Sequence, residues 1–420
     1  MQIENLSHDG RGVARIHGKV TFIEGVLPNE KITYRVTKTG RKFDEAQCVD
    51  LIDESPHRTA PKCDYYHECG GCQLQHLKYS AQIEHKQTHF EQLIQKNLNC
   101  KKTTFVDPLT ADEQNYRRRA RLGVFYNERH NKLSFGFRKQ GTNRLLDIDD
   151  CPVLDSNISN ALPVWRAFLE NWKGVSKVGH IEVTQGDLGQ CWVVNITKPL
   201  TEPQKQALAT FALMQQVNVY LKGKETQIIH ESFTNEYTVQ QAHLQFESDG
   251  FMQVNAKLNE KMVTQALNWL DIQPEERILD LFCGLGNFSL PIATVAKELV
   301  GIDGDKALIE TAKMNAQNNS LENMKFHIAN LFEDVSYMPW VRRQQYDKVL
   351  LDPGREGASE ICQNMNQFKA KRIVYVSCNP STMVRDGQEL EKQGFKLKRA
   401  GIMDMFPQTK HVEAMMLWEK

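Results

Sequence analysis

The sequence predicts an α/β protein of three domains: a β-barrel over residues 1–54, a central α+β domain over 55–245 and a Rossmann-like sheet over 246–420. Three observations lead to this prediction. Short strands separated by turn residues fill the first 54 residues, and three cysteines follow within ten positions of one another. From residue 277 onward, apolar strands alternate with helical segments, which is typical of a parallel sheet covered by helices.

The composition restricts where the protein works. It has 420 residues, of which 40% are hydrophobic, with 52 basic and 52 acidic side chains. No apolar run reaches the roughly 18 residues that a membrane-spanning helix needs, and the first residues lack the features of a secretory signal. We therefore expect a cytoplasmic protein without a membrane partner, in which the ten cysteines stay reduced.

The N-terminal domain is predicted from short apolar stretches. Residues 13–16, 20–23, 31–36 and 46–49 have β-type composition, and turns such as His17-Gly18 separate them. Four or five strands at this spacing predict a small barrel of the OB type, a fold used to bind nucleic acids.

The central domain is expected to hold a metal centre. Cys63, Cys69 and Cys72 lie close together, and Gly70 and Gly71 between them allow the backbone to wrap tightly around a shared site. We expect Cys151 to be the fourth ligand, because a Cys followed by Pro recurs at the last ligand of iron–sulfur runs. On spacing alone, a structural zinc site of four cysteines is nearly as good an interpretation.

A basic stretch lies within the same domain. Residues 101–146 carry eleven Lys or Arg and only four acids, although the net charge of the chain is zero. The pattern predicts a helix over 79–98 and a hairpin with arms at 122–126 and 133–138. Arginines between aromatic side chains suit phosphate contacts and base stacking, although exposed basic strands can also be simply solvated. Residues 151–245 are mixed α and β and indicate no chemistry.

The C-terminal domain opens with a helix over 259–270, and a strand over 278–282 then runs into a Gly284-x-Gly286 turn. A strand, a glycine turn and a helix form the first unit of a nucleotide-binding sheet. The next strand ends at Asp303, whose carboxylate can accept both hydroxyls of a ribose. The third glycine of the dinucleotide fingerprint is missing, which argues against NAD and favours a cofactor without phosphates, such as S-adenosylmethionine.

Further strands are predicted over 324–328, 346–353 and 373–376, followed by an antiparallel pair at 395–399 and 415–418. Open α/β sheets place their chemistry at the carboxyl ends of the strands. Four polar side chains are expected at that edge: Asp303, Asn330, Asp352 and Cys378. Taken alone, Cys378 could equally be a small buried hydrophobic residue.

Five motifs in this order resemble the bacterial RNA uracil-C5 methyltransferases. They are Cys63-x5-Cys69-Gly-Gly-Cys72, Phe251-x-Gln253-Val254-Asn255, Asp280-Leu-Phe-Cys-Gly-x-Gly-Asn287-Phe288, Ser377-Cys378-Asn379-Pro380 and His411-x-Glu413. Within that family, the chain is most similar to the enzymes of 23S rRNA uracil 1939, which combine a TRAM barrel, an iron–sulfur domain and a methyltransferase domain. The segment Asp352-Pro353-Gly354-Arg355 departs from the family, which usually has Pro or Ala before this arginine.

The resemblance implies a role for each candidate residue. Cys378 would be the nucleophile and Glu413 the proton acceptor, while a [4Fe–4S] cluster, favoured over zinc, would be held by Cys63, Cys69, Cys72 and Cys151. The contacts to S-adenosylmethionine would come from Gln253, Phe282, Asn287, Asp303, Asn330 and Asp352. The expected partner is 23S rRNA, free or in an assembling large subunit, with a monomeric protein and no DNA.

The chemistry explains why a thiol and a base are needed together. Uracil C5 is too weak a nucleophile to attack a methyl sulfonium, but a thiolate that adds at C6 gives C5 carbanion character. A base must then remove the C5 proton before the thiol can leave.

Three other interpretations stay open. A tRNA uracil-C5 methyltransferase would share the last domain, but such enzymes are expected generally to lack the barrel and the cysteines. A related rRNA enzyme with the cluster would lack the barrel. A non-catalytic iron–sulfur protein that binds RNA would need neither Cys378 nor Glu413.

Overall fold

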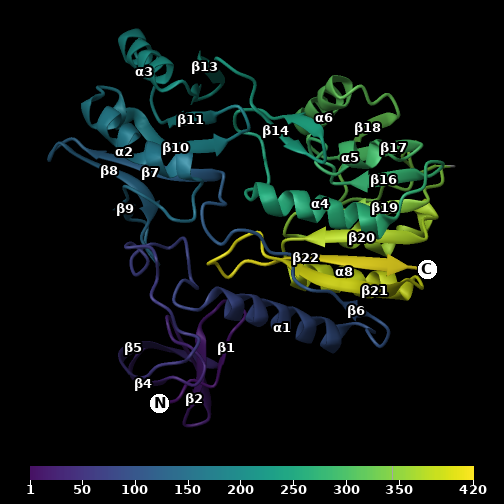
Figure 1. The fold of residues 1–420 in the computed structure, drawn as a ribbon, viewed down its shortest axis with the longest axis horizontal. Helices are drawn as coiled ribbons and strands as arrows, with labels where there is room; N and C mark the ends of the chain where they lie inside the picture. Colours follow the sequence, from purple (N-terminus) through teal and green to yellow (C-terminus); the bar gives the residue numbers. More distant parts are fainter. Residues whose placement is uncertain (343) are drawn as a thin grey trace.

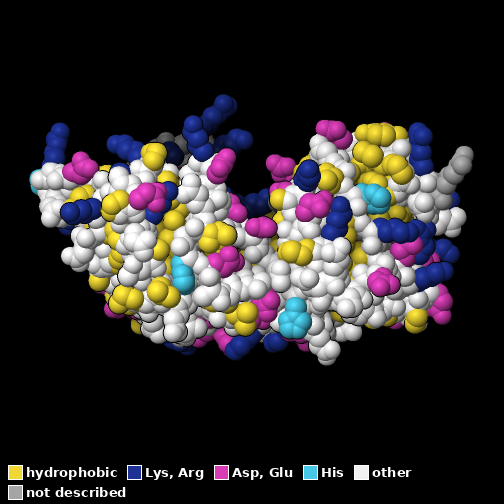
Figure 2. Space-filling view, turned by 90° about the horizontal axis from the view of Figure 1, so that it is seen from above, with side chains coloured by type: hydrophobic (Ala, Val, Ile, Leu, Met, Phe, Trp, Pro, Cys, Tyr) yellow, Lys and Arg dark blue, Asp and Glu magenta, His cyan; other side chains and the backbone are white. Residues whose placement is uncertain are grey.

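The computed structural model describes residues 1–342 and 344–420. A small barrel, a central sheet and a large C-terminal sheet follow one another along the chain, and helix α1 runs beneath the last of these (Figure 1). In the space-filling view, a hollow separates two lobes, and Lys and Arg side chains project beside it (Figure 2). Within the described chain, no helix is long and apolar enough to cross a membrane.

The N-terminal sheet has five strands, in agreement with the four or five that the sequence predicts, and their order is β1-β2-β3-β5-β4. An antiparallel bridge between Gln2 and Lys31 joins the start of the chain to β4 and closes the barrel. Ile3, Ile23 and Ile32 fill its interior. The strands are β1 (Asn5–Leu6), β2 (Gly12–Ile16), β3 (Lys19–Ile23), β4 (Lys31–Thr39) and β5 (Phe43–Asp53).

Helix α1 (Tyr79–Asn97) confirms the predicted helix, but it packs on the C-terminal domain. Its buried face contains Phe90 and Ile94, in the same core as the C-terminal sheet, and also two polar side chains, Gln82 and Lys86. The following strand β6 (Thr104–Phe105) pairs with β21 at the edge of that sheet. The sequence-based boundaries place residues 79–105 in the central domain, because nothing local in a two-residue strand indicates a partner so far along the chain.

The central sheet has seven strands in the order β13-β12-β11-β10-β7-β8-β9. The predicted hairpin is confirmed, since β7 and β8 pair antiparallel. In the core between the sheet and its helices, the ring of Trp165 is tilted against that of Trp192 and meets that of Phe211 edge to face. The elements are β7 (Arg119–Asn127), β8 (Lys132–Arg138), β9 (Leu145–Asp147), α2 (Ser156–Asn171), a 3-10 turn (Val175–Lys177), β10 (Val178–Gln185), β11 (Gln190–Ile196), α3 (Glu202–Gln215), β12 (Asn218–Lys222) and β13 (Thr226–His230).

The hairpin of β14 (Glu236–Val239) and β15 (Ala242–Gln245) connects the two larger sheets. Its Tyr237 and Leu244 are buried in the same core as helix α4. The C-terminal sheet has the order β18-β17-β16-β19-β20-β22-β21-β6. Its first five strands are parallel, and β22 and β21 form the predicted antiparallel pair.

Two apolar cores cover the faces of this sheet, one containing α4 and α5 and the other containing α1, α7 and α8. The parallel strands direct their carboxyl ends to one edge, which therefore collects the residues that follow them. The elements are α4 (Ala256–Leu270), β16 (Arg277–Leu281), α5 (Ser289–Ala293), β17 (Glu298–Asp303), α6 (Lys306–Asn318), β18 (Met324–Ile328), β19 (Lys348–Leu351), α7 (Ser359–Gln363), a 3-10 turn (Met365–Phe368), β20 (Arg372–Ser377), α8 (Pro380–Lys392), β21 (Lys396–Met403) and β22 (Glu413–Glu419).

Candidate active site

Cys378 lies in the turn between strand β20 and helix α8. The Asn379 side chain caps α8 by accepting a hydrogen bond from the Ser381 N–H at 3.2 Å, and Pro380 occupies the first helical position. The backbone N–H of Asn379 donates to the Ser377 hydroxyl at 3.0 Å. These local bonds fix the turn, so the thiol is held at the edge of the sheet.

Strand pairing brings Glu413 to the same place. In the antiparallel ladder of β20 and β22, Ser377 is opposite Ala414. Because partners in such a ladder advance in opposite directions, the next position after Ser377 is Cys378 and its neighbour across the ladder is Glu413. Glu413 is 6% exposed at the start of β22. Two residues 35 positions apart in the sequence thus meet through the register of the sheet.

Asp352 and Arg355 lie in the loop after β19, which is parallel to β20. The Asn379 amide and the Thr382 hydroxyl both donate to the carbonyl oxygen of Arg355, at 2.9 Å and 3.2 Å. The loop is therefore attached to the turn that carries Cys378. A Cβ added at Gly354 would meet no atom within 4 Å, so the departure from the family pattern at this position has no steric cause.

The site holds its ionisable groups in unusual protonation states. Burial, together with the charges of Glu413 and Asp352, raises the pKa of Cys378 to about 11, while Arg355 acts in the opposite direction. Burial also raises the pKa of Glu413 to about 7. Burial and the charge of Glu413 raise the pKa of Asp352 well above its ordinary value. A carboxyl with a pKa near 7 suits a general base at neutral pH.

A cavity of about 400 Å³, which we name the glycine-loop cavity, lies on one side of Cys378. Its wall includes five of the six residues expected to contact the cofactor, together with Cys378 and Glu413. Those five are Gln253, Phe282, Asn287, Asp303 and Asp352. Asn330 is not among the described lining residues; it is exposed after β18 and donates to Glu333 at 2.7 Å.

The glycine loop is held by its neighbours. Asp303 accepts a hydrogen bond from the Gly284 N–H at 3.0 Å, which ties the end of β17 to the loop after β16. Gly286 has φ +104°, and a Cβ there would come within 2.4 Å of Leu290, so only glycine fits. Phe282 adopts a left-handed backbone, with φ +65°, where β16 ends. The loop backbone thereby faces the cavity.

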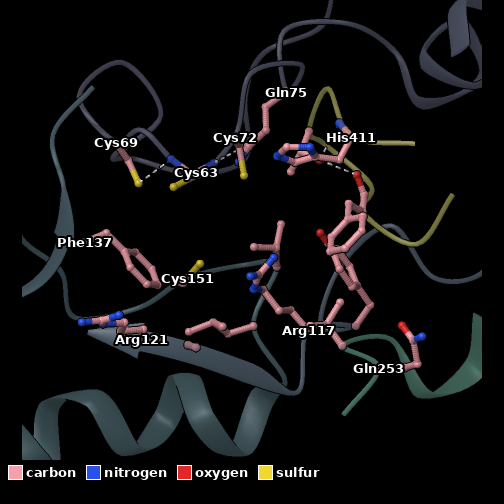
Figure 3. A pocket seen from close by; sticks show the side chains of 18 of the residues that line it. Cys63, Cys69, Cys72, Gln75, Arg117, Arg121, Phe137, Cys151, Gln253 and His411 are labelled. Atoms are coloured by element: carbon pink, nitrogen blue, oxygen red, sulfur yellow. Dashed lines mark hydrogen bonds between the residues drawn. The ribbon is translucent and has the colours of Figure 1, made fainter. Parts of the chain in front are cut away.

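A second cavity of about 530 Å³, which we name the cysteine cavity, lies on the other side. Figure 3 shows Cys63, Cys69 and Cys72 on one wall with Cys151 across from them. The same cavity reaches Cys378 and Glu413. The two cavities share five lining residues, which are Phe251, Gln253, Arg355, Cys378 and Glu413.

The four predicted ligands thus line one cavity. Burial raises the pKa of Cys72 to about 11 and that of Cys151 to about 12, and it also raises the pKa values of Cys63 and Cys69. Within residues 1–342 and 344–420, no three His, Cys, Asp or Glu side chains are arranged to hold a single metal ion.

Comparison with known proteins shows the family of the chain. Residues 78–420 match the family described as tRNA (Uracil-5-)-methyltransferase, and residues 2–49 match the TRAM domain. The chain belongs to the tRNA (uracil-5-)-methyltransferase family. The TRAM match confirms that the N-terminal barrel is the TRAM domain that the resemblance implies.

Curated relatives match over the whole chain. The 23S rRNA (uracil(1939)-C(5))-methyltransferase RlmD of Vibrio cholerae is 40% identical over 419 residues, which cover 100% of this chain and 95% of the relative. The protein of the same name from Shewanella woodyi is also 40% identical, with the same coverage.

A solved structure shares the fold. It is the Pyrococcus abyssi tRNA (uracil-54, C5)-methyltransferase with S-adenosyl-L-homocysteine, which has a TM-score of 0.76 and 22% identity and aligns over 100% of this chain and 99% of that one. This likeness shows the fold that the two chains share. The expectation that tRNA enzymes generally lack the barrel stays a prediction.

The structure adds residues that the sequence did not indicate. Tyr237, from the stretch without recognised signals, lines the glycine-loop cavity, and its hydroxyl donates to the Asn287 side chain at 3.1 Å. Asn287 also exchanges two hydrogen bonds with Asn259, at 2.8 and 2.9 Å. Arg117 lines the cysteine cavity, and so does His411, which the sequence indicates through the His411-x-Glu413 motif (Figure 3). Arg117 lies in the basic stretch that the sequence singles out, whereas no local signal indicates Tyr237.

Proposed function

We propose that the protein transfers a methyl group from S-adenosylmethionine to C5 of a uracil in 23S rRNA, at uracil 1939. The observation that carries this proposal is the place of Cys378 and Glu413 on the wall common to two cavities. A methyl donor in the glycine-loop cavity and a uracil in the cysteine cavity would meet at this shared wall. The 40% identical relatives named for 23S rRNA favour that substrate over tRNA.

Each residue of the shared wall then has a task. The Cys378 thiolate adds to C6 of the uracil, and the electron pair of the C5–C6 bond becomes available at C5. Bound S-adenosylmethionine supplies the methyl group that C5 takes up. Glu413 accepts the C5 proton, the double bond re-forms and the Cys378 sulfur leaves C6. Phe251, whose side chain is 62% exposed at this wall, offers a flat apolar surface for a base.

Arg355 is the residue of this chain that favours the thiolate. With a pKa of about 11, Cys378 is almost entirely protonated at neutral pH in the free protein. Arg355 lines both cavities and lowers that pKa against the effects of burial and of the two carboxyls. A positive charge beside a thiol stabilises the anion that must form before addition.

We assign S-adenosylmethionine to the glycine-loop cavity on the chemistry of its wall. Asp303 offers carboxylate oxygens for ribose hydroxyls, and Asp352 offers a second acid beside Cys378. Gln253, Phe282 and Asn287 complete the predicted contacts. Asn330 would join them only after giving up its hydrogen bond to Glu333, a change that an exposed loop permits.

We also propose that the cysteine cavity holds a [4Fe–4S] cluster. The four thiols line one cavity, and the resemblance of Cys63-x5-Cys69-Gly-Gly-Cys72 to the family motif favours a cluster over the zinc ion that four cysteines could also hold. Its role would be to hold together segments 63–72 and 151 of the central domain. Anaerobically purified protein should be brown and contain iron; a colourless protein that contains zinc would contradict the cluster.

The barrel, the basic hairpin of β7 and β8 and the cysteine cavity would together contact RNA. We place the domain boundaries near residues 54 and 245, except that residues 79–105 pack on the C-terminal domain. We propose a monomer that acts in the cytoplasm on free rRNA or an assembling subunit and not on DNA. Arg121, which is exposed on β7 and lines the cysteine cavity, would meet phosphates.

The test is transfer of labelled methyl from S-adenosylmethionine to unmodified 23S rRNA and, in parallel, to unmodified tRNA. We expect label at one uracil C5 of 23S rRNA. Label in tRNA alone would retain the chemistry and overturn the substrate, and the shared fold with the Pyrococcus abyssi enzyme makes that the second candidate. No label in either RNA would favour a non-catalytic RNA-binding protein.

A further inference from the structure

Residues 404–411 belong to the connection between β21 and β22, and they reach the cysteine cavity. Phe406, Thr409 and His411 of this segment line that cavity, and Glu413 follows two positions later. Of the described residues that line the glycine-loop cavity, none comes from 404–411. The segment therefore faces the space assigned to RNA and not the space assigned to the cofactor.

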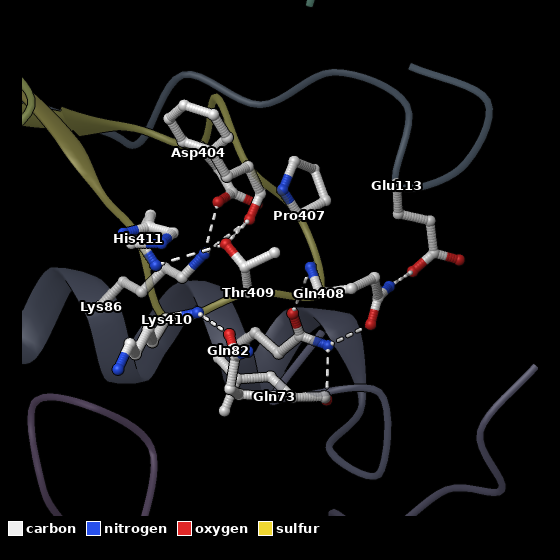
Figure 4. Close-up of polar contacts among 12 residues, drawn as sticks. Gln73, Gln82, Lys86, Glu113, Asp404, Pro407, Gln408, Thr409, Lys410 and His411 are labelled. Atoms are coloured by element: carbon white, nitrogen blue, oxygen red, sulfur yellow. Dashed lines mark hydrogen bonds and ion pairs between the residues drawn. The ribbon is translucent and has the colours of Figure 1, made fainter. Parts of the chain in front are cut away.

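Lys86 of α1 forms a buried ion pair with Asp404 at the start of this segment (Figure 4). Its ammonium donates to Asp404 Oδ1 at 2.6 Å and to the carbonyl oxygen of Phe406 at 3.3 Å. The two side chains are only 3% and 0% exposed. A buried ion pair of this kind seldom adds stability over apolar packing, so a role in fixing one conformation is the better explanation.

Gln82, one helical turn before Lys86, forms hydrogen bonds with Gln408 in both directions. Its amide donates to Gln408 Oε1 at 2.9 Å, and its Oε1 accepts from the Gln408 N–H at 3.1 Å. Gln408 has φ +68°, a left-handed conformation that a non-glycine residue keeps only when its surroundings impose it. The backbone N–H groups of Gln73 and Leu74 also donate to the carbonyl oxygen of Gln408, both at 3.0 Å.

We propose that Gln82 and Lys86 are positioning residues, which hold segment 404–411 in the shape that receives the RNA base. This inference rests on the proposed function. It assigns a role in the reaction to a helix more than 300 positions before the segment it holds. It also predicts a selective effect. Loss of the contacts that Gln82 and Lys86 make with the segment, which we name the clamp, should raise the KM for RNA and leave cofactor binding intact.

The experiment compares Lys86→Met with Lys86→Arg, and uses Lys348→Met as the matched control. Lys348 forms an ion pair with Glu276 at 2.7 Å and is 7% exposed, but it lies where β19 begins, at the opposite edge of the sheet from the site. Lys86→Met should raise the KM for RNA about tenfold, as expected when a charge-assisted hydrogen bond is lost. Lys86→Arg should keep the KM for RNA close to that of the wild type, and Lys348→Met should lower the melting temperature without changing this KM.

The affinity for S-adenosylmethionine should stay within about twofold of the wild type in all three variants, a difference well below the tenfold step. An unchanged KM for RNA in folded Lys86→Met, or a parallel loss of cofactor affinity, would overturn the proposal. If Lys86→Met does not fold, Gln82→Leu tests the same clamp without leaving a buried charge unpaired.

Hydrogen exchange tests whether Lys86 holds segment 404–411 without relying on any methylation of RNA. The amides of 404–411 should exchange faster in Lys86→Met while those of β20 keep their protection; equal protection of the segment in both proteins would refute the clamp. A wild-type protein that methylates no RNA would refute the proposed function, and the exchange measurement would still decide whether Lys86 holds the segment.

Discussion

Glu413 is a buried carboxyl whose pKa lies near the pH at which an enzyme of this kind works. As a base it must be unprotonated, so proton removal should become faster as the pH rises through about 7 and then level off. Glu413→Gln should abolish this dependence and accumulate a covalent protein–RNA adduct, because addition proceeds and elimination cannot. Single-turnover rates against pH and denaturing gels measure the two effects. Rapid turnover without adduct would contradict the assignment.

The same carboxyl makes folding sensitive to pH. Its pKa rises from 4.5 to about 7 on folding, so between these values the folded protein keeps a proton that the unfolded chain has released. The free energy of unfolding should therefore fall as the pH rises from 4.5 to 7, by roughly 3 kcal/mol for this group. Below 4.5 the contribution is fully present. Denaturant unfolding of the wild type and Glu413→Gln across this range should show the difference, and parallel curves would contradict it.

Cys378 is one of several cysteines, so its role needs a comparison within the chain. Cys378→Ala should lose methyl transfer by at least about a thousandfold, since no other group can activate C5 in the same way. It should bind S-adenosylmethionine as the wild type does. Cys100→Ala, at a half-buried position outside both cavities, should keep full activity. Labelled methyl transfer measures the activities and calorimetry the binding.

At the scale of elements, the loops after the strands differ in what they tolerate. Gly286→Ala forces a side chain onto φ +104° and against Leu290, so it should cost about 1–3 kcal/mol of stability and weaken cofactor binding. Gly354→Ala meets open space and should be neutral or slightly stabilising. Thermal unfolding and cofactor titration of both variants check this. If Gly286→Ala and Gly354→Ala changed stability and cofactor affinity equally, the backbone geometry at Gly286 would not explain the need for glycine there.

The strand ends were predictable because their signals are local. A short apolar run that stops near Asp303, Asp352 or Cys378 indicates both a buried strand and the edge where it ends. The local pattern could not show that Cys378 lies beside Glu413, because this depends on the register of β20 and β22. Only the resemblance linked the two residues. Strand β6 and Tyr237 were missed, because their partners lie far away in the sequence and their own neighbours carry no periodicity.

At the scale of the whole molecule, a buried charge contributes to the attachment of the barrel, beside the apolar contacts of Leu6 and Leu27 with Leu77. Glu30 of the barrel is 0% exposed and accepts hydrogen bonds from Arg58, which lies outside it, at 2.5 and 2.7 Å. Burial opposes ionisation of Glu30, but Arg58 and two backbone N–H groups together lower its pKa. Arg58→Met would leave this carboxylate buried without a partner, at a cost of about 3–5 kcal/mol.

We therefore expect Arg58→Met to loosen the barrel while the C-terminal domain keeps its affinity for S-adenosylmethionine. Limited proteolysis near residue 54 and small-angle scattering should detect the change. Lys31→Met removes a solvent-exposed ion pair with Asp53 in the same barrel and should have little effect. Equal protease resistance of both variants would contradict the role of Glu30.

The pairing of β6 with β21 also bears on how the chain is made. Thr104 lies beside Arg399, so the edge of the last sheet needs a segment that leaves the ribosome almost 300 residues earlier. At about 5–20 residues per second, helix α1 and β6 wait roughly 15–60 s for their partners. During that time the apolar face around Phe90 and Ile94 has nothing to pack against. A newly made chain should therefore depend on chaperones until its last residues emerge, and truncation before β21 should leave it prone to aggregation.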